Sequence, residues 1–194
     1  DMLLSYGERL SSLLLASILN HHGIPCREML PEDIGLVTDG EYGNATIDLS
    51  VSTKNLRRAL GGRERYVVPG FYGISREYRI TTLGRGGSDY SASAIAHCIG
   101  ATSVDLWKDV AGFMSADPKT VKSAVPLDRL SYREAAELSY FGARIFHPLT
   151  FEPLESKKIP IRILDINEPG NGRPRTTIGA NGVRRRDAVK SVTC

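Results

Sequence analysis

The sequence predicts an α/β fold, a three-layer α/β/α sandwich around a mostly parallel sheet. Short apolar, β-branched segments alternate with segments of helical periodicity along most of the chain, and glycine or proline residues separate them. We find neither an internal repeat nor a low-complexity tract. A chain of 194 residues can bury a substantial core without disulfides or a structural metal. It accommodates one domain, or one domain and the start of a second.

Helical periodicity is clearest near the start of the chain. Leu3, Leu10, Leu14 and Ile18 recur at helical spacing, and Gly23 is a stop signal, so the pattern predicts a helix over residues 5–21. Further helices are expected at residues 56–60, 90–99 and 131–140, of which the last opens on a Ser-x-x-Glu capping box, Ser131 to Glu134.

The expected strands are short and lie between these helices. They cover residues 35–39, 65–68, 80–83, 103–107 and 159–164. Pro160 favours the beginning of the last strand. From Pro169 onward glycine, proline, asparagine and arginine dominate, which predicts a domain edge near residues 170–188.

Composition favours a soluble cytosolic protein. The chain is 41% hydrophobic and 24% charged, which is ordinary for a globular domain. No uninterrupted apolar run approaches the roughly 20 residues that span a bilayer, and the first residues do not resemble a signal peptide. The three cysteines, Cys26, Cys98 and Cys194, form no Cys-x-x-Cys pair, so neither a disulfide framework nor a zinc site is expected.

Positive charge gathers in one terminal stretch. The net charge is +3, but residues 171–190 alone carry six lysines and arginines against Asp187. A nucleic-acid interface normally places its basic residues over a folded face. This stretch is instead typical of a solvated loop and linker, so we expect no binding to nucleic acid and none to membranes.

The segment from Thr81 to Asp89 carries the strongest chemical signal. An expected strand enters a glycine-rich turn and then a helix, an arrangement whose free backbone N–H groups bind anions. The segment matches neither the Walker A motif nor Gly-x-Gly-x-x-Gly. Arg85 can hold a carboxylate through two parallel hydrogen bonds, and Ser88 can donate another. Asp89 can cap the helix or orient groups around a transferred phosphate.

The same segment resembles part of a known protein family, and the resemblance extends over nearly the whole chain. Residues 81–94, TTLGRGGSDYSASA, resemble the signature of the aspartate kinase family within the amino acid kinase superfamily. Further segments resemble that family in the same order: residues 5–11, 37–39, 69–73, 105–110, 116–119 and 140–148. Several separated motifs in the right order are far more specific than any one of them.

The resemblance implies roles for residues on the substrate side. Glu8 would receive the α-ammonium group of aspartate, while Arg85 and Ser88 would hold its carboxylate oxygens. Phe71 would lie near the substrate, although plain core packing is an equally good interpretation. Arg85 and Asp89 are the candidate catalytic residues, and Asp89 would orient or deprotonate groups at the reacting centre.

On the nucleotide side the resemblance implies contacts with ATP. The candidates are Lys108, Asp109, Met114, Lys119, Arg144 and Ile145. Met114, Lys119 and Arg144 depart from the usual tyrosine, arginine and lysine, and arginine and lysine are not interchangeable at a phosphate. Mg²⁺ would be bound through the ATP phosphates and water, because no His-x-x-x-His pair or carboxylate cluster indicates a protein-only metal site.

The implied activity is ATP-dependent phosphorylation of the side-chain carboxylate of L-aspartate to 4-phospho-L-aspartate, a step toward lysine, threonine and methionine. Residues 1–170 would form the C-terminal portion of the kinase domain, residues 171–188 a basic linker, and residues 189–194 the start of a regulatory ACT domain. The family's Lys-Phe-Gly-Gly loop has no counterpart, so we expect a domain truncated at its N-terminus, inactive alone, from a dimeric parent. The alternatives are an amino acid kinase with another acidic substrate and a non-catalytic nucleotide-binding or dimerisation fragment.

Overall fold

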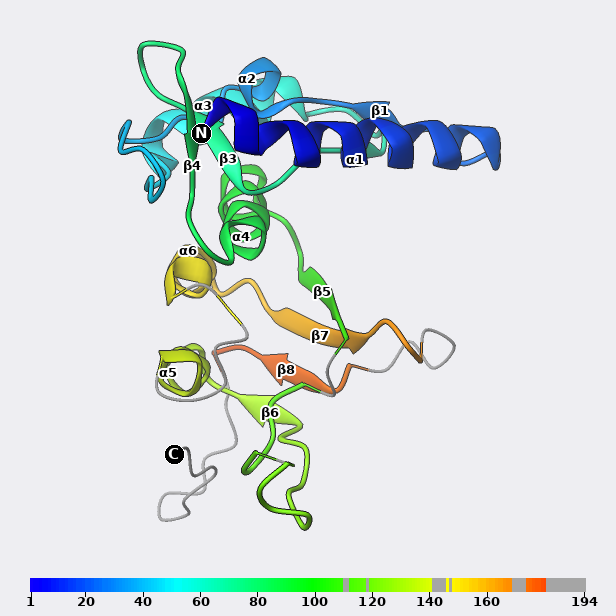
Figure 1. Ribbon diagram of the computed structural model, residues 1–194, viewed down its shortest axis with the longest axis vertical. Coiled ribbons are helices and arrows are strands. Elements are labelled where there is room, and N and C mark those ends of the chain that lie inside the picture. The colour runs from blue at the N-terminus through cyan, green and yellow to red at the C-terminus, as the bar shows by residue number, and fades with distance from the viewer. Residues whose placement is uncertain (110–111, 118, 141–145, 147, 169–173, 181–194) are drawn as a thin grey trace. The chain divides into compact units, whose positions relative to one another are not determined.

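The computed structural model divides the chain into two compact units, Asp1–Ile99 and Gly100–Cys194 (Figure 1). The structure describes all residues except 110–111, 118, 141–145, 147, 169–173 and 181–194. The predicted beginning of an ACT domain, residues 189–194, therefore lies outside the described residues, as does most of the predicted linker.

The first unit combines helices with two small pairs of strands. Its elements are α1 (Met2–His21), β1 (Arg27–Glu28), α2 (Pro31–Ile34), α3 (Leu49–Ala59), β2 (Tyr66–Val67), β3 (Tyr72–Ile74), β4 (Ile80–Thr82) and α4 (Gly87–Ile99). Strand β1 pairs with β2 in parallel, and β3 pairs with β4 as an antiparallel hairpin. Helices α3 and α4 pack against each other. The strand expected at residues 35–39 is reduced to single bridges at Val37 and Thr38.

The buried residues of helix α1 are all small, and most of its large apolar side chains are exposed. Ser5, Ser12 and Ala16 are its buried residues. Large apolar side chains on the other faces are exposed: Met2, Leu3, Leu4, Tyr6, Leu10, Leu13, Leu14, Leu15 and Ile18. The apolar periodicity that predicts this helix therefore does not mark its buried face.

By length and composition alone, α1 would also suffice to cross a membrane, which was not predicted from the sequence. Two charged residues, Glu8 and Arg9, lie in the first half of the helix. Arg9 forms an ion pair with Glu32, and the Ser12 hydroxyl donates to Glu28. A helix whose polar face is bound to its own domain in this way is a helix of the folded unit rather than a bilayer span.

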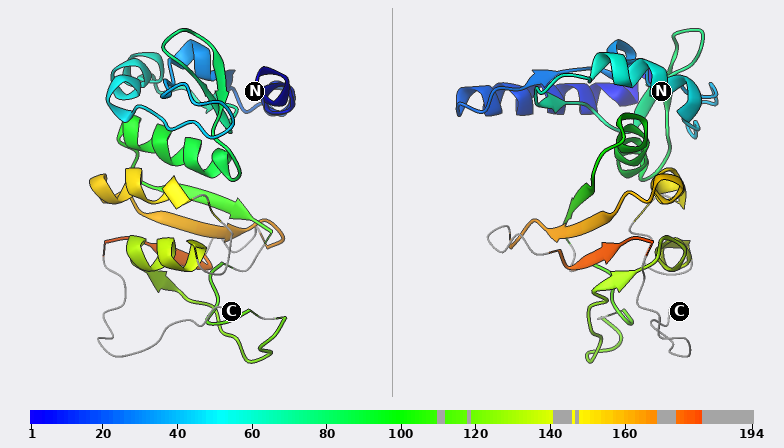
Figure 2. Two further views of the ribbon diagram at one scale, coloured as in Figure 1. Left: turned by 60° about the vertical axis from the view of Figure 1, so that its left-hand side comes forward. Right: turned by 180° about the vertical axis from the view of Figure 1, so that it is seen from behind.

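The second unit is built around a four-stranded sheet in the order β5-β7-β8-β6. Its elements are β5 (Val104–Lys108), β6 (Arg129–Leu130), α5 (Tyr132–Leu138), the 3₁₀ turn η2 (Pro148–Thr150), α6 (Glu152–Lys157), β7 (Ile161–Asp165) and β8 (Thr176–Ile178). Strand β7 pairs in parallel with β5 and antiparallel with β8, which pairs in parallel with β6. Helices α5 and α6 lie next to each other on the same side of these strands (Figure 2).

The α/β class predicted from the sequence is confirmed, and three of the five strand pairings among the described residues are parallel. The capping box is also confirmed, because Ser131 accepts from the Glu134 N–H while the Glu134 side chain accepts from the Ser131 N–H. One expectation is corrected. Residues 176–178 were expected in a loop, but they form β8, and Thr176 and Ile178 are wholly buried.

Candidate functional site

A glycine-rich turn joins β4 to α4 in the first unit. Gly84 and Gly86 both have positive φ angles, 78° and 76°, which non-glycine residues rarely adopt. The Gly87 N–H donates to the Gly84 carbonyl, and the Asp89 N–H donates to the Gly86 carbonyl. The sequence prediction of a strand, a glycine-rich turn and a helix is therefore confirmed at this place.

Gly87 is required by close packing rather than by its φ angle. A Cβ atom at this position would lie 2.8 Å from the Leu83 Cβ and 3.2 Å from the Phe71 Cδ2. Such distances leave no room for a side chain. The beginning of α4 is therefore pressed against the backbone and ring of Phe71.

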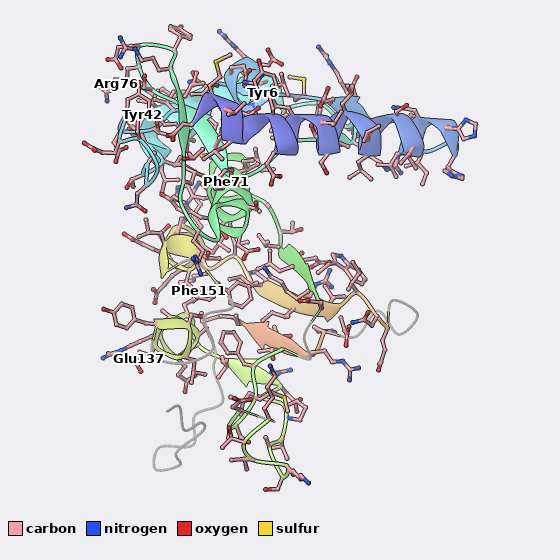
Figure 3. The ribbon with its side chains drawn as sticks, viewed as in Figure 1. Tyr6, Tyr42, Phe71, Arg76, Glu137 and Phe151 are labelled. Atoms are coloured by element: carbon pink, nitrogen blue, oxygen red, sulfur yellow. The ribbon has the colours of Figure 1, made fainter. Side chains whose placement is uncertain are left out.

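Phe71 lies beside α4 (Figure 3) with a positive φ of 73°, which is unusual for a bulky residue. Its N–H donates to the Ser91 hydroxyl, which in turn donates to the carbonyl of Ser88. The preceding Gly70 comes so close to Ser91 that a Cβ would lie 2.8 Å from its Oγ. Backbone strain of this kind persists only where its surroundings enforce it, and it concentrates at functional sites.

Three predicted site residues lie in the turn and the first turn of α4. Arg85 and Ser88 are exposed, and Asp89 is half-buried. Because α4 begins at Gly87, Asp89 lies inside its first turn, so the alternative that Asp89 is the N-cap is wrong. An exposed arginine and serine beside the N-terminus of a 13-residue helix can bind a carboxylate or phosphate.

Glu8 lies in the first half of α1 and is half-buried. Helix α1 packs beside β4, the strand that leads into the glycine-rich turn. The Asp1 carboxylate fastens this contact, because its Oδ2 accepts hydrogen bonds from the N–H groups of Thr82 and Gly43, at 2.9 and 2.8 Å. The elements that carry Glu8 and Arg85 are therefore neighbours in one unit.

The residues that hold these elements together were not predicted from the sequence. Asp1, Arg9, Glu32 and Tyr72 form side-chain contacts between α1, α2, β3 and β4. These partners are separated by 23 to 81 residues, so no local pattern could have revealed the contacts. The two adjacent charged residues in a largely apolar helix, Glu8 and Arg9, were a signal that the sequence did contain.

The predicted nucleotide residues lie in the second unit, at the end of β5 and in the segment after it. Lys108 is the last residue of β5, in register with Asp165 at the end of the parallel strand β7. Its Nζ lies 5.1 Å from the ring centroid of Phe146. Asp109 follows the strand and is exposed. Ligands of parallel α/β sheets bind outside the carboxyl ends of the strands, where these residues are located.

The other nucleotide candidates lie further along the chain, and two of them are not described by the structure. Met114 is half-buried and forms an isolated bridge with Pro126, while Lys119 is exposed in a turn where its N–H donates to the Asp117 carboxylate. Arg144 and Ile145 lie outside the described residues. Within the part of the chain that the structure describes, no group of three or more histidine, cysteine or acidic side chains could hold a metal ion.

The sequence of the chain matches a known protein family. The model of the amino acid kinase family matches residues 1–165. The chain belongs to this family.

Aspartokinases are among the proteins that the chain resembles. The chain is 36% identical to aspartokinase 3, chloroplastic, from Arabidopsis thaliana over 99% of its own length, and 36% identical to aspartokinase 1 from Bacillus subtilis over 84%. A solved structure of Escherichia coli aspartokinase III, in complex with aspartate and ADP, superposes with a TM-score of 0.83 and 33% identity over 92% of this chain.

The chain is shorter than these relatives. It covers 34% of the Arabidopsis protein, 40% of the Bacillus protein and 40% of the E. coli chain. A fourth match, to UMP kinase from Bacillus anthracis, has 18% identity and a TM-score of 0.57, and it supports the fold alone.

Proposed function

We propose that the chain is part of an aspartate kinase, which transfers the γ-phosphoryl group of ATP to the side-chain carboxylate of L-aspartate. The observation that carries this proposal is the turn from Gly84 to Asp89, with an exposed arginine and serine beside a helix N-terminus. The aspartate and ADP bound to the E. coli relative support it. We expect the complete protein to form a homodimer.

On the substrate side, the two charges of the proposed site match a zwitterion. Glu8 supplies the anion for the α-ammonium group, and Arg85 supplies the cation for a carboxylate, assisted by the hydroxyl of Ser88. Phe71 closes the packing behind the turn, since its ring touches the first residue of α4. Binding both poles at a fixed separation selects an amino acid over a simple carboxylic acid.

On the nucleotide side, Lys108 and Asp109 are the principal candidates, with Met114, Lys119, Arg144 and Ile145 as further contacts. Lys108 lies at the carboxyl end of a parallel strand and carries a positive charge suited to a phosphate. Mg²⁺ held by the ATP phosphates and by water would neutralise charge on the triphosphate.

Both reactants are anions, so the proposed catalysis consists mainly of positioning and charge neutralisation. Arg85 and the N–H groups at the beginning of α4 would stabilise the carboxylate as it approaches the γ-phosphorus. The carboxylate is already a nucleophile at neutral pH and loses no proton on attack. Asp89 would therefore orient the groups around it rather than act as an obligatory base, and the product would be an acyl phosphate.

Replacing Arg85 tests the substrate site directly. Arg85→Ala removes a charge-assisted, bidentate contact, so the affinity for L-aspartate should fall roughly 10- to 100-fold in calorimetric titrations. Arg133→Ala is the matched control, since its side chain is 86% exposed and forms only an i,i+4 pair with Glu137 on α5. This variant should bind aspartate like the unmodified chain.

Two results would contradict the proposal. One is equal aspartate affinity of the Arg85→Ala and unmodified chains. The other is equal binding of L-aspartate and succinate, which lacks the ammonium group that Glu8 is proposed to receive.

A further inference from the structure

A partly buried cluster of charged and aromatic residues lies under α1, next to the proposed substrate residues but not among them. The Arg9 Nη2 forms an ion pair with the Glu32 Oε1 at 2.7 Å, and the Arg9 Nε donates to the Ser5 hydroxyl at 3.2 Å. The Arg9 and Glu32 side chains are only 24% and 28% exposed. An ion pair with this degree of burial is screened less by salt than a surface pair.

Tyr72 completes the cluster from strand β3. Its side chain is wholly buried, and its hydroxyl donates to the Glu32 Oε2 at 3.3 Å. The Arg9 guanidinium carbon lies 5.1 Å from the centroid of the Tyr72 ring, within the range of a cation–π contact. Burial, reinforced by the negative charge of Glu32, raises the pKa of Tyr72, so the hydroxyl remains a donor at neutral pH.

The cluster joins the immediate neighbours of two proposed substrate residues. Arg9 follows Glu8 on α1, and Tyr72 follows Phe71 at the beginning of β3. Turning α1 about its axis would move Glu8 and would also pull Arg9 away from Glu32 and Tyr72. The contacts of Arg9 therefore help to hold the rotation of α1 that carries Glu8, together with the hydrogen bonds of Asp1 and Ser12 at other points of the helix.

We propose that Arg9 is a positioning residue, which holds α1 against Glu32 and Tyr72 and so sets the Glu8 carboxylate for the ammonium group of an amino acid substrate. This inference rests on the proposed function for the role of Glu8. Arg9 itself does not contact the substrate. Lysine at this position retains the charge but has neither the planar fork nor the flat stacking surface of arginine.

The test compares Arg9→Ala and Arg9→Lys with the unmodified chain. In calorimetric titrations, Arg9→Ala should lower aspartate affinity roughly tenfold or more, since small misplacements of a binding group are costly. The aspartate affinity of Arg9→Lys should lie between those of Arg9→Ala and the unmodified chain. The affinity for ATP-Mg²⁺ should not change, because the proposed nucleotide residues lie in the other unit. Arg76→Ala is the matched control, since this arginine of the first unit also pairs with a carboxylate but is 72% exposed.

Amide hydrogen exchange gives a readout that needs no substrate. Arg9→Ala should speed exchange in the first half of α1 and at residues 70–73, whereas Arg76→Ala should not.

Unchanged exchange in both segments would overturn the proposal. An equal loss of affinity for aspartate and for nucleotide would also overturn it, because such a loss indicates general destabilisation. If the exchange changes but the unmodified chain does not bind aspartate, the proposed function fails at Glu8 and the positioning role fails with it. Exchange that changes while aspartate affinity stays constant would overturn the positioning role alone.

Discussion

Asp48 illustrates how a single carboxylate ties a helix to a distant loop. It is the N-cap of α3, where its side chain accepts from the N–H groups of Ser50 and Val51. It also accepts from the Ser50 hydroxyl and from Arg76 in the β3–β4 hairpin. These interactions, with the Ser50 hydroxyl contributing most, lower the pKa of Asp48 from 3.8 to about 2.

The cap therefore makes the stability of the first unit depend on pH. Since the pKa of Asp48 is lower in the folded than in the unfolded chain, its contribution is complete above about pH 4 and is lost as the pH falls toward 2. Asp48→Ala should lower the free energy of unfolding by about 1 kcal/mol at pH 7. The difference from the unmodified chain should shrink between pH 4 and 2 in urea titrations.

Asp48→Asn is the control for charge. Asparagine still accepts from the backbone N–H groups but cannot ionise, so this variant should be intermediate at pH 7 and approach the unmodified chain near pH 2. A difference between Asp48→Ala and the unmodified chain that stays constant from pH 7 to 2.5 would show that the ionised form has no special role.

At the scale of single elements, two helices differ in whether they have room for a side chain at a glycine. Gly7 lies inside α1, and a Cβ there would meet no atom within 4 Å. Gly87 begins α4 and has no room for a Cβ beside Leu83 and Phe71. Helix propensity favours alanine over glycine by up to about 1 kcal/mol at either position, so packing decides the outcome.

Gly7→Ala should therefore stabilise the chain by about 0.5–1 kcal/mol, and Gly87→Ala should destabilise it by about 1–3 kcal/mol. Urea denaturation of both variants measures these changes in the free energy of unfolding. We expect the dependence of that free energy on urea concentration to be the same for both variants. Each variant serves as the control for the other, since both add the same methyl group to a helical glycine. Stabilisation by Gly87→Ala would mean that α4 shifts away from Phe71 at little cost.

Elements with a complete local signal were predictable, and those that depend on distant partners were not. The capping box at Ser131 and the glycine-rich turn are local, and both were found from the sequence. Strand β8 has only three residues within a segment rich in glycine and arginine, and it is a strand because Ile161 to Ile163 lie opposite it. The buried face of α1 was also not predictable, since it consists of small residues while the leucines point outward.

At the scale of the whole molecule, the proposed substrate residues and the proposed nucleotide residues belong to different units. Glu8, Phe71, Arg85, Ser88 and Asp89 belong to the first unit. Every described nucleotide candidate belongs to the second. Both sets stay predictions from the sequence, based on short motifs that are each local in the chain. The cluster of Arg9 could not be predicted in this way, because its members come together only on folding.

This division predicts that a single substitution can weaken the binding of one ligand and leave the binding of the other unchanged. Lys108→Ala removes a cation at the end of β5, so the affinity for ATP-Mg²⁺ should fall about tenfold while binding of aspartate alone is retained. Arg85→Ala should show the reverse pattern. Lys122→Ala, which removes another lysine of the second unit outside the proposed site, is the matched control and should change neither affinity. If Lys108→Ala weakened both ligands equally, or if Lys122→Ala reduced nucleotide affinity as much, the end of β5 would not be the place where the triphosphate is held.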